Sequence, residues 1–138
     1  MTTEHIACIG SNAKPIVTEL VIGNSCIRAI VDTGATASFI PKFGKVLTNN
    51  RATTKKTLSR ARTANNSTMT LKEEITLLTR PRSAPIEPVE ATFLIMPQKD
   101  SIMGYDAIMG LNLIKAFNIK VALADDKMRA YIGDTIIW

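Results

Sequence analysis

The sequence predicts an all-β domain, a small closed β-barrel-like fold with one short helix near the C-terminus. Short runs rich in β-branched residues recur along the chain with turn signals between them, and only one segment has helical spacing. A content of 46% hydrophobic and 21% charged residues is typical of a globular protein. At 138 residues the chain suits one ordinary core and is too short for two. We expect a single domain over residues 1–138, with a core at about 15–132 and terminal extensions at 1–14 and 133–138.

A β-hairpin is expected first. Residues 15–22 (PIVTELVI) are rich in β-branched side chains, Gly23-Asn24-Ser25 has turn composition, and residues 26–31 (CIRAIV) form the second run. Asp32-Thr33-Gly34-Ala35 follows directly. Asp32 is therefore predicted at the point where a buried strand opens into a tight loop.

The rest of the chain alternates between exposed and buried segments. Residues 48–70 are polar and are expected to form an exposed hairpin arm around the turn signal Asn65-Asn66-Ser67. The later predicted elements are a strand pair at 74–78 and 89–96, a short strand at 105–110, a helix with Leu113, Ile114 and Phe117 on one face, and strands at 119–123 and 128–132. This layout is that of a small closed or sandwiched β structure.

Composition argues against several other classes. No apolar run approaches the roughly 20 residues that cross a bilayer, so no membrane partner is expected. The N-terminus lacks the basic start and apolar block of a secretory signal, which favours a cytoplasmic location or one within virus-like particles. Cys8 and Cys26 are too few for a disulfide framework and are interpreted as reduced, mostly buried residues. His5 and these cysteines lack metal-ligand spacing, so we expect neither metal nor cofactor.

The net charge of +5 is concentrated in one basic run: Lys42, Lys45, Arg51, Lys55, Lys56, Arg60 and Arg62. Such a run makes nucleic-acid binding an alternative that has to be weighed. No aromatic residue follows Phe43 within the run, and aromatic platforms are what bind single strands beyond charge attraction. The run is therefore interpreted as a solvated basic face, and no nucleic-acid partner is expected.

Asp32-Thr33-Gly34 is suited to holding a reactive carboxylate. Gly34 allows a close approach and a sharp turn, and the Thr33 hydroxyl can bond to a neighbouring loop. Peptide hydrolysis needs one group to accept a proton from water and another to donate to the carbonyl. The chain has no second Asp-Thr-Gly or Asp-Ser-Gly, so the partner must be Asp32 of another copy. Two-fold symmetry juxtaposes identical residues, and carboxylates about 3 Å apart share one proton.

An alternative is that Asp32 only begins an Asx turn after a strand. The context favours the catalytic interpretation, because an apolar β run leads into the motif. The chain then leaves the motif through a segment of small and partly apolar residues, Ala35-Thr36-Ala37-Ser38-Phe39-Ile40.

Residues 29–40 (AIVDTGATASFI) resemble the catalytic strand and loop of retropepsins, the aspartic proteases of retroviruses and LTR retrotransposons, most closely those of gypsy-type elements. Residues 106–113 (DAIMGLNL) are similar to the apolar strand, Gly-x-Asn/Asp signature and short helix of that family. Residues 62–68 resemble its flap, a hairpin that closes over substrate. The likeness covers roughly residues 15–132 and implies a retropepsin fold that acts as a two-fold homodimer.

The resemblance also implies roles for individual residues. Two copies of Asp32 would activate a water that attacks the scissile carbonyl, without a covalent intermediate. Thr33 would brace the two loops across the dimer, and Gly34 would face the substrate backbone. Asn112 would support the loop from behind, or alternatively cap the short helix. Substrate binding is implied for a residue of the loop and for the flap tip, namely Ala35, Thr63, Ala64, Asn65, Asn66 and Ser67.

The predicted function is therefore an aspartic endopeptidase that processes the polyprotein of a retroelement. The alternative is a catalytically silent retropepsin-like module for dimerisation or binding in a cellular protein. The intact Asp-Thr-Gly-Ala sequence at Asp32 favours the enzyme.

Overall fold

The structure is a computed structural model that describes residues 3–6, 15–62 and 66–138. Strands dominate this part of the chain, as predicted. The elements in chain order are β1 (Thr3–Ile6), β2 (Ile16–Ile22), β3 (Ser25–Val31), β4 (Ser38–Pro41), α1 (Lys45–Asn49), β5 (Lys55–Arg62), β6 (Thr68–Pro81), β7 (Val89–Met96), β8 (Ala107–Met109), α2 (Leu111–Ala116), β9 (Ile119–Ala124), β10 (Lys127–Ile132) and β11 (Thr135–Ile136).

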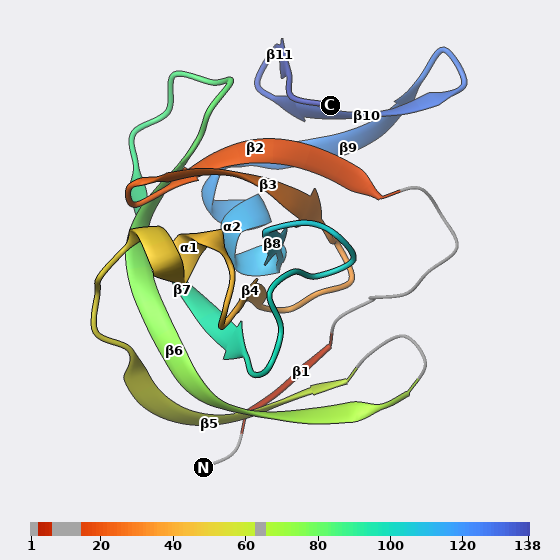
Figure 1. Cartoon of the computed structure of the whole chain (residues 1–138). Coiled ribbons are helices and arrows are strands. Elements are labelled where there is room, and N and C mark those ends of the chain that lie inside the picture. The colour runs from red at the N-terminus through yellow and green to blue at the C-terminus, as the bar shows by residue number, and fades with distance from the viewer. Residues whose placement is uncertain (1–2, 7–14, 63–65) are drawn as a thin grey trace.

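Six of the strands close into a ring, which confirms the predicted closed β fold. They pair in the order β6-β2-β3-β8-β4-β7, and β7 pairs back to β6. Two further strands, β5 and β1, continue the sheet outward from β6 (Figure 1). The order β11-β10-β9 forms a separate three-stranded sheet above β2 in the same view.

The first hairpin has the predicted position, and its turn depends on a distant side chain. Gly23 adopts φ +56°, and a Cβ there would lie 2.1 Å from Oδ1 of Asn50. The same oxygen accepts a hydrogen bond from the N–H of Asn24 over 2.8 Å. The Asn50 Nδ2 donates to the Val46 carbonyl at 2.8 Å, so one buried amide ties the turn to α1.

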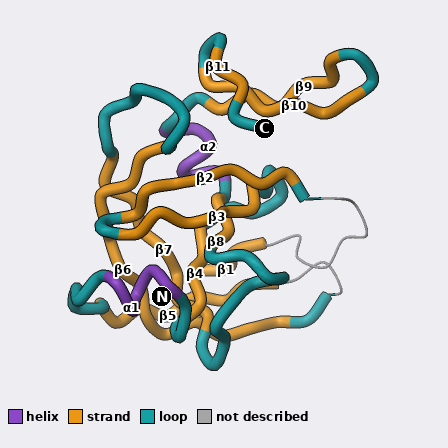
Figure 2. Tube along the Cα trace, turned by 45° about the horizontal axis from the view of Figure 1, so that its top comes forward, coloured by secondary structure: helices purple, strands orange, loops and turns teal. Residues whose placement is uncertain are grey.

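The first helix, α1, corrects the prediction of a single helix. It spans only Lys45–Asn49 and buries a single side chain, that of Val46. It contacts β3 and β4, whereas α2 contacts β4, β7, β8 and β9, and the two helices lie well apart (Figure 2). The second helix is in the predicted place, and the two strands predicted after it are present as β9 and β10, with β11 as a further short strand.

The predicted arm consists of β5 and the first part of β6. These strands are antiparallel, with an irregularity in register between Lys56 and Ser59. The strand expected at residues 74–78 belongs to the much longer β6, whose last part pairs with β7 and β2 inside the ring. On its outer side β5 pairs in parallel with β1, from Thr3 opposite Ser59 onward.

Two buried clusters fill the fold. The main core cluster includes Leu20, Phe93 and Phe117. The second, here called the arm cluster, comprises Ile30, Ala35, Ala37, Phe39, Ala61, Leu71, Leu94, Met96, Ile102 and Ile108. Burial of a Leu or Phe side chain contributes roughly 1.5–3 kcal/mol. Because Leu71 and Phe39 are both 0% exposed, this cluster holds the arm against the ring.

Both chain ends within the described residues are paired with other strands. Near the N-terminus, β1 pairs with β5. Near the C-terminus, β11 pairs with β10, and Ile137 and Trp138 pack on the main core cluster. Cys26 is exposed, which corrects the expectation of a mostly buried thiol, because its side chain points outward from β3. Cys8 lies outside the described residues.

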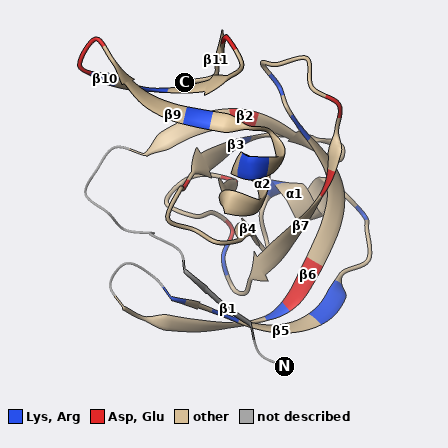
Figure 3. Cartoon of the chain, turned by 180° about the vertical axis from the view of Figure 1, so that it is seen from behind, with Lys and Arg blue, Asp and Glu red and all other residues tan. Residues whose placement is uncertain are grey.

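The basic run lies in solvent, as interpreted from the sequence. All of its residues except Lys42 are exposed, and Lys42 forms an ion pair of 2.9 Å with Glu73. Basic residues of β5 lie beside acidic residues of β6 (Figure 3), since Lys55 is opposite Glu74 and Lys56 is opposite Glu73. None of the helices in the described segments is both long enough and apolar enough to cross a membrane.

Candidate active site

Asp32 stands where β3 leaves the ring. Its N–H donates to the carbonyl of Met109 over 3.0 Å, which continues the pairing of β3 with β8. The short strand β8 lies between β3 and β4, because Ile108 is opposite both Ile30 and Phe39. The loop from β3 to β4 therefore starts and ends on one central strand, which restricts its movement.

The carboxylate of Asp32 is oriented by its own turn. The Ala35 N–H donates to the Asp32 carbonyl over 3.1 Å and closes the turn. The Gly34 N–H donates to Oδ1 of Asp32 over 2.9 Å. The Asx turn weighed as an alternative is thus present, and it holds a half-buried carboxylate beside an exposed Thr33. A fixed carboxylate of this kind is compatible with catalysis.

The start of α2 supports this turn from behind. The Leu111 N–H donates to the Ala35 carbonyl over 2.8 Å. A Cβ on Gly110 would lie 2.0 Å from the carbonyl oxygen of Ala37 and 2.9 Å from that of Ala35. Real Cβ atoms do not approach backbone so closely, so this packing requires glycine. The two motifs recognised in the sequence are in direct contact.

A buried hydroxyl completes the support. Ser38 is 0% exposed; it accepts from the Gly110 N–H at 3.0 Å and donates to Oδ1 of Asn112 at 2.7 Å. The Asn112 Nδ2 donates to the Thr92 carbonyl at 3.4 Å. Gly110, not Asn112, is the N-cap of α2, so the helix-cap alternative for Asn112 is wrong. Sequence reasoning missed Ser38, although it is a hydroxyl in an otherwise apolar strand.

The residues predicted to bind substrate divide into three groups. Ala35 is 0% exposed and its side chain belongs to the arm cluster, so it packs behind the loop and has no surface to offer a substrate. Asn66 and Ser67 are exposed, and Asn66 has φ 66°, the left-handed geometry that Asn tolerates. Thr63, Ala64 and Asn65 lie outside the described residues. The arm and the end of β3 point to the same side of the ring (Figures 1 and 3).

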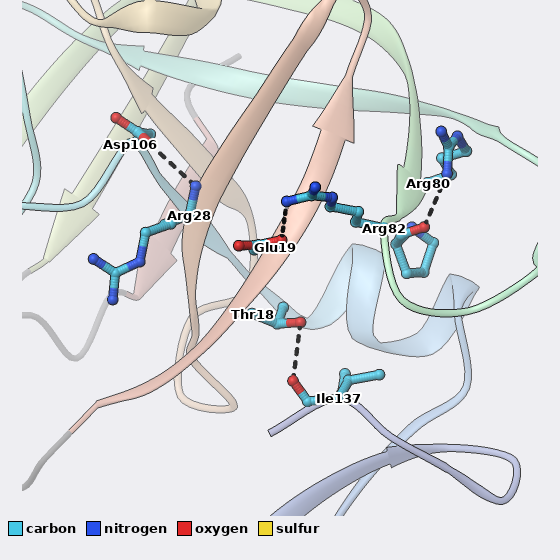
Figure 4. A network of polar contacts seen from close by, with 8 residues as sticks. Thr18, Glu19, Arg28, Arg80, Arg82, Asp106 and Ile137 are labelled. Carbon is cyan, nitrogen blue, oxygen red and sulfur yellow. Dashed lines mark hydrogen bonds and ion pairs between the residues drawn. The ribbon is translucent and has the colours of Figure 1, made fainter.

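A polar network on β3 fixes the segment that leads into β8 (Figure 4). The backbone N–H of Arg28 donates to Oδ2 of Asp106 over 3.1 Å, and the Asp106 N–H donates to the Arg28 carbonyl over 2.9 Å. The Arg28 guanidinium also lies 5.0 Å from the centre of the Tyr105 ring, within cation–π range. These contacts fix the register in which β8 pairs with β3.

Neighbouring polar contacts tie β2 to later parts of the chain. Glu19 pairs with Arg82 at 2.6 Å, which raises the pKa of the guanidinium. The Thr18 hydroxyl donates to the carbonyl of Ile137 over 3.4 Å. Within the described residues, no group of three His, Cys, Asp or Glu side chains is placed to hold a metal ion.

Comparisons with known proteins agree with this geometry. The model of a family described as retroviral aspartyl protease matches residues 11–120. No curated protein sequence matches the chain. Among solved structures, the chain is similar to the retroviral protease-like domain of Ddi1 from Leishmania major, with a TM-score of 0.56 and 14% sequence identity. The match covers 91% of this chain and 94% of that one, and at this identity it shows the fold alone.

Proposed function

Because the chain belongs to the retroviral aspartyl protease family, we propose that it is an aspartic endopeptidase whose active site forms between two copies. The observation that carries the proposal is Asp32, oriented by the Gly34 N–H on a turn that α2 supports. The sequence offers no second Asp-Thr-Gly, so the other carboxylate comes from Asp32 of the partner copy. An exposed Thr33 beside it is available to brace the opposing loop.

The proposed reaction uses the two Asp32 carboxyl groups in different protonation states. The ionised group accepts a proton from a water molecule, whose oxygen attacks the scissile carbonyl carbon. The protonated group donates to the carbonyl oxygen, which gives a neutral tetrahedral diol. The Asp32 that took the proton from water then gives it to the amide nitrogen while the other, now ionised, Asp32 takes a proton from one diol hydroxyl, so that the C–N bond breaks and an acid and an amine are released. No covalent intermediate forms with the protein.

The substrate is proposed to be an extended peptide held between the loop and the arm. The arm would close on it as a lid, and main-chain hydrogen bonds would hold it as an added strand. Junctions in the polyprotein of a gypsy-type retroelement are the proposed natural substrates, cut in the cytoplasm or within virus-like particles.

A second candidate function is a catalytically silent module for dimerisation or binding. The similarity to the protease-like domain of Ddi1 favours it, because the fold occurs there outside a retroelement protease. This candidate predicts a dimer that binds peptides and does not cut them.

The deciding experiment compares the wild-type chain with Asp32→Asn on a peptide library from pH 4 to pH 7. Sedimentation first establishes that both are folded dimers. Cleavage that vanishes in Asp32→Asn and is blocked by a transition-state-mimicking inhibitor of aspartic proteases supports the enzyme. A folded wild-type dimer that cuts nothing in the library would reject it and favour the silent module.

A further inference from the structure

A cavity of about 300 Å³ with a mixed polar and apolar lining lies beside the loop that carries Asp32. It collects residues from the loop, the arm, the ring and α2, and Leu94 provides an apolar wall. Its polar lining consists of Thr36, Thr57, Ser59, Glu74, Thr92 and Asn112. Unlike the arm cluster nearby, the cavity would offer an entering substrate side chain polar groups as well as the apolar surface of Ala37 and Leu94.

Among the described residues that line the cavity, Glu74 supplies the only ionisable side chain. It is half-buried on β6, opposite Lys55 of β5 and Leu94 of β7. Within the described segments, no hydrogen bond or ion pair holds its carboxylate, and Lys55 is exposed. The adjacent Glu73 points to the opposite face of the strand and is paired with Lys42.

The neighbouring polar groups of the cavity are already held in place. The hydroxyls of Thr92 and Thr76 share a hydrogen bond of 2.9 Å. The amide of Asn112 is fixed between Ser38 and the Thr92 carbonyl. Thr92 and Asn112 therefore have partners of their own, whereas the Glu74 carboxylate has none within the described segments.

We propose that this cavity binds a Lys or Arg side chain of the peptide substrate and that Glu74 selects it. The inference rests on the proposed function, because it takes the loop beside Asp32 as the place where peptides are cut. A cation bound to the carboxylate in a partly enclosed site is screened less than one in open solvent. Its alkyl stem packs on Leu94 while its charged end reaches Glu74.

The position of the cavity limits which residue of the substrate can place its side chain in it. Thr36, in its lining, is four residues beyond Asp32 along the loop. An extended peptide advances about 3.3 Å per residue, and we take the second to fourth positions from the cleaved bond as the range that the selected side chain occupies. In a two-fold dimer the cavity occurs twice, once on each side of that bond.

The test uses one cleavable peptide with Lys, Met or Glu placed in turn at the second, third and fourth positions from the cleaved bond. Met matches the length of Lys without its charge. The wild-type chain is expected to cut the Lys peptide with a kcat/KM about tenfold above that of the Met peptide at one of these positions or more. Glu74→Gln brings this ratio to about one, whereas the matched control Glu73→Gln keeps it.

A binding measurement separates this inference from the proposed function. In the Asp32→Asn background, the Kd of the Lys and Met peptides is measured with and without Glu74→Gln. Tighter binding of the Lys peptide that depends on Glu74 supports the inference even if the wild-type chain cuts nothing. Equal affinities, or a preference that survives Glu74→Gln, overturn it even if the wild-type chain is an active protease.

Discussion

Ser38 on β4 donates a 2.7 Å hydrogen bond to Asn112 in α2, although 74 residues separate them in the sequence. The same hydroxyl accepts from the Gly110 N–H at the start of the helix. One buried oxygen therefore joins the strand that follows the Asp32 loop to the helix that supports that loop.

Replacement of Ser38 by Ala is expected to lower the free energy of unfolding by about 1–3 kcal/mol, because the buried N–H of Gly110 loses its acceptor and Oδ1 of Asn112 loses its donor. Urea titration followed by circular dichroism measures this. Ser83→Ala, at an exposed position, is the control and should change stability by less than about 0.5 kcal/mol. Equal effects of the two substitutions would contradict the bridging role.

Gly110→Ala should destabilise the fold by about 3 kcal/mol or more, because its Cβ would collide with the carbonyl oxygens of Ala37 and Ala35. Gly104→Ala is the control, since φ there is +82° but no atom lies within 4 Å of the added Cβ. Gly104→Ala should lower the free energy of unfolding by only about 1–2 kcal/mol, because alanine tolerates left-handed backbone angles less well than glycine. Thermal unfolding ranks the two, and the reverse order would refute the close packing at Gly110.

Asn50→Ala removes the amide that joins the β2–β3 turn to α1. The side chain accepts from the Asn24 N–H and donates to the Val46 carbonyl, and it is 6% exposed. We expect a loss of about 2–3 kcal/mol in chemical denaturation. The exposed neighbour Asn49 provides the control, and Asn49→Ala should be nearly neutral.

The ion pair between Lys42 and Glu73 predicts a pH-dependent contribution to stability. The Lys42 hydrogen bond lowers the pKa of Glu73 below its usual 4.5. The folded state then binds this proton less strongly than the unfolded state, so the contribution is present above about pH 4.5 and is lost as pH falls through the lowered pKa. Because both side chains are about one-third exposed or more, we expect only about 0.5 kcal/mol.

The measurement is the free energy of unfolding of the wild-type chain and of Glu73→Gln at pH 7 and pH 3. The difference between them should be present at pH 7 and absent at pH 3, and 1 M salt should reduce it. Glu90→Gln, at an exposed position on β7, is the control. A difference that persists at pH 3 would show that Glu73 stabilises the fold by packing instead of charge.

Strand positions could be predicted where burial alternates along the sequence. In β3 the exposed Cys26 and Arg28 alternate with the buried Ile27 and Ala29, and this pattern is visible without a structure. The placement of Asp32 at the end of that strand follows from the same pattern. The exposure of Cys26 follows from it too, and was missed because cysteine was treated as buried by type.

Features that depend on contacts between distant segments could not be predicted. Helix α1 buries only Val46 and is tied to the first hairpin by Asn50, so it leaves no periodic pattern. The buried position of Ala35 depends on the arm folding over the loop. The contribution of Ser38 depends on Asn112, far along the chain.

Closure of the ring has a consequence for how copies of the chain behave at high concentration. With β6 and β7 paired, the larger sheet extends outward in the described residues through β5, which β1 covers only over Ser59–Arg62. The uncovered stretch of β5 carries Lys55 and Lys56, both exposed. Unpaired strand borders promote aggregation, and lysines along them oppose it through repulsion between like charges. Lys55 and Lys56 of the basic run therefore oppose edge-to-edge pairing of this strand with another copy of the chain.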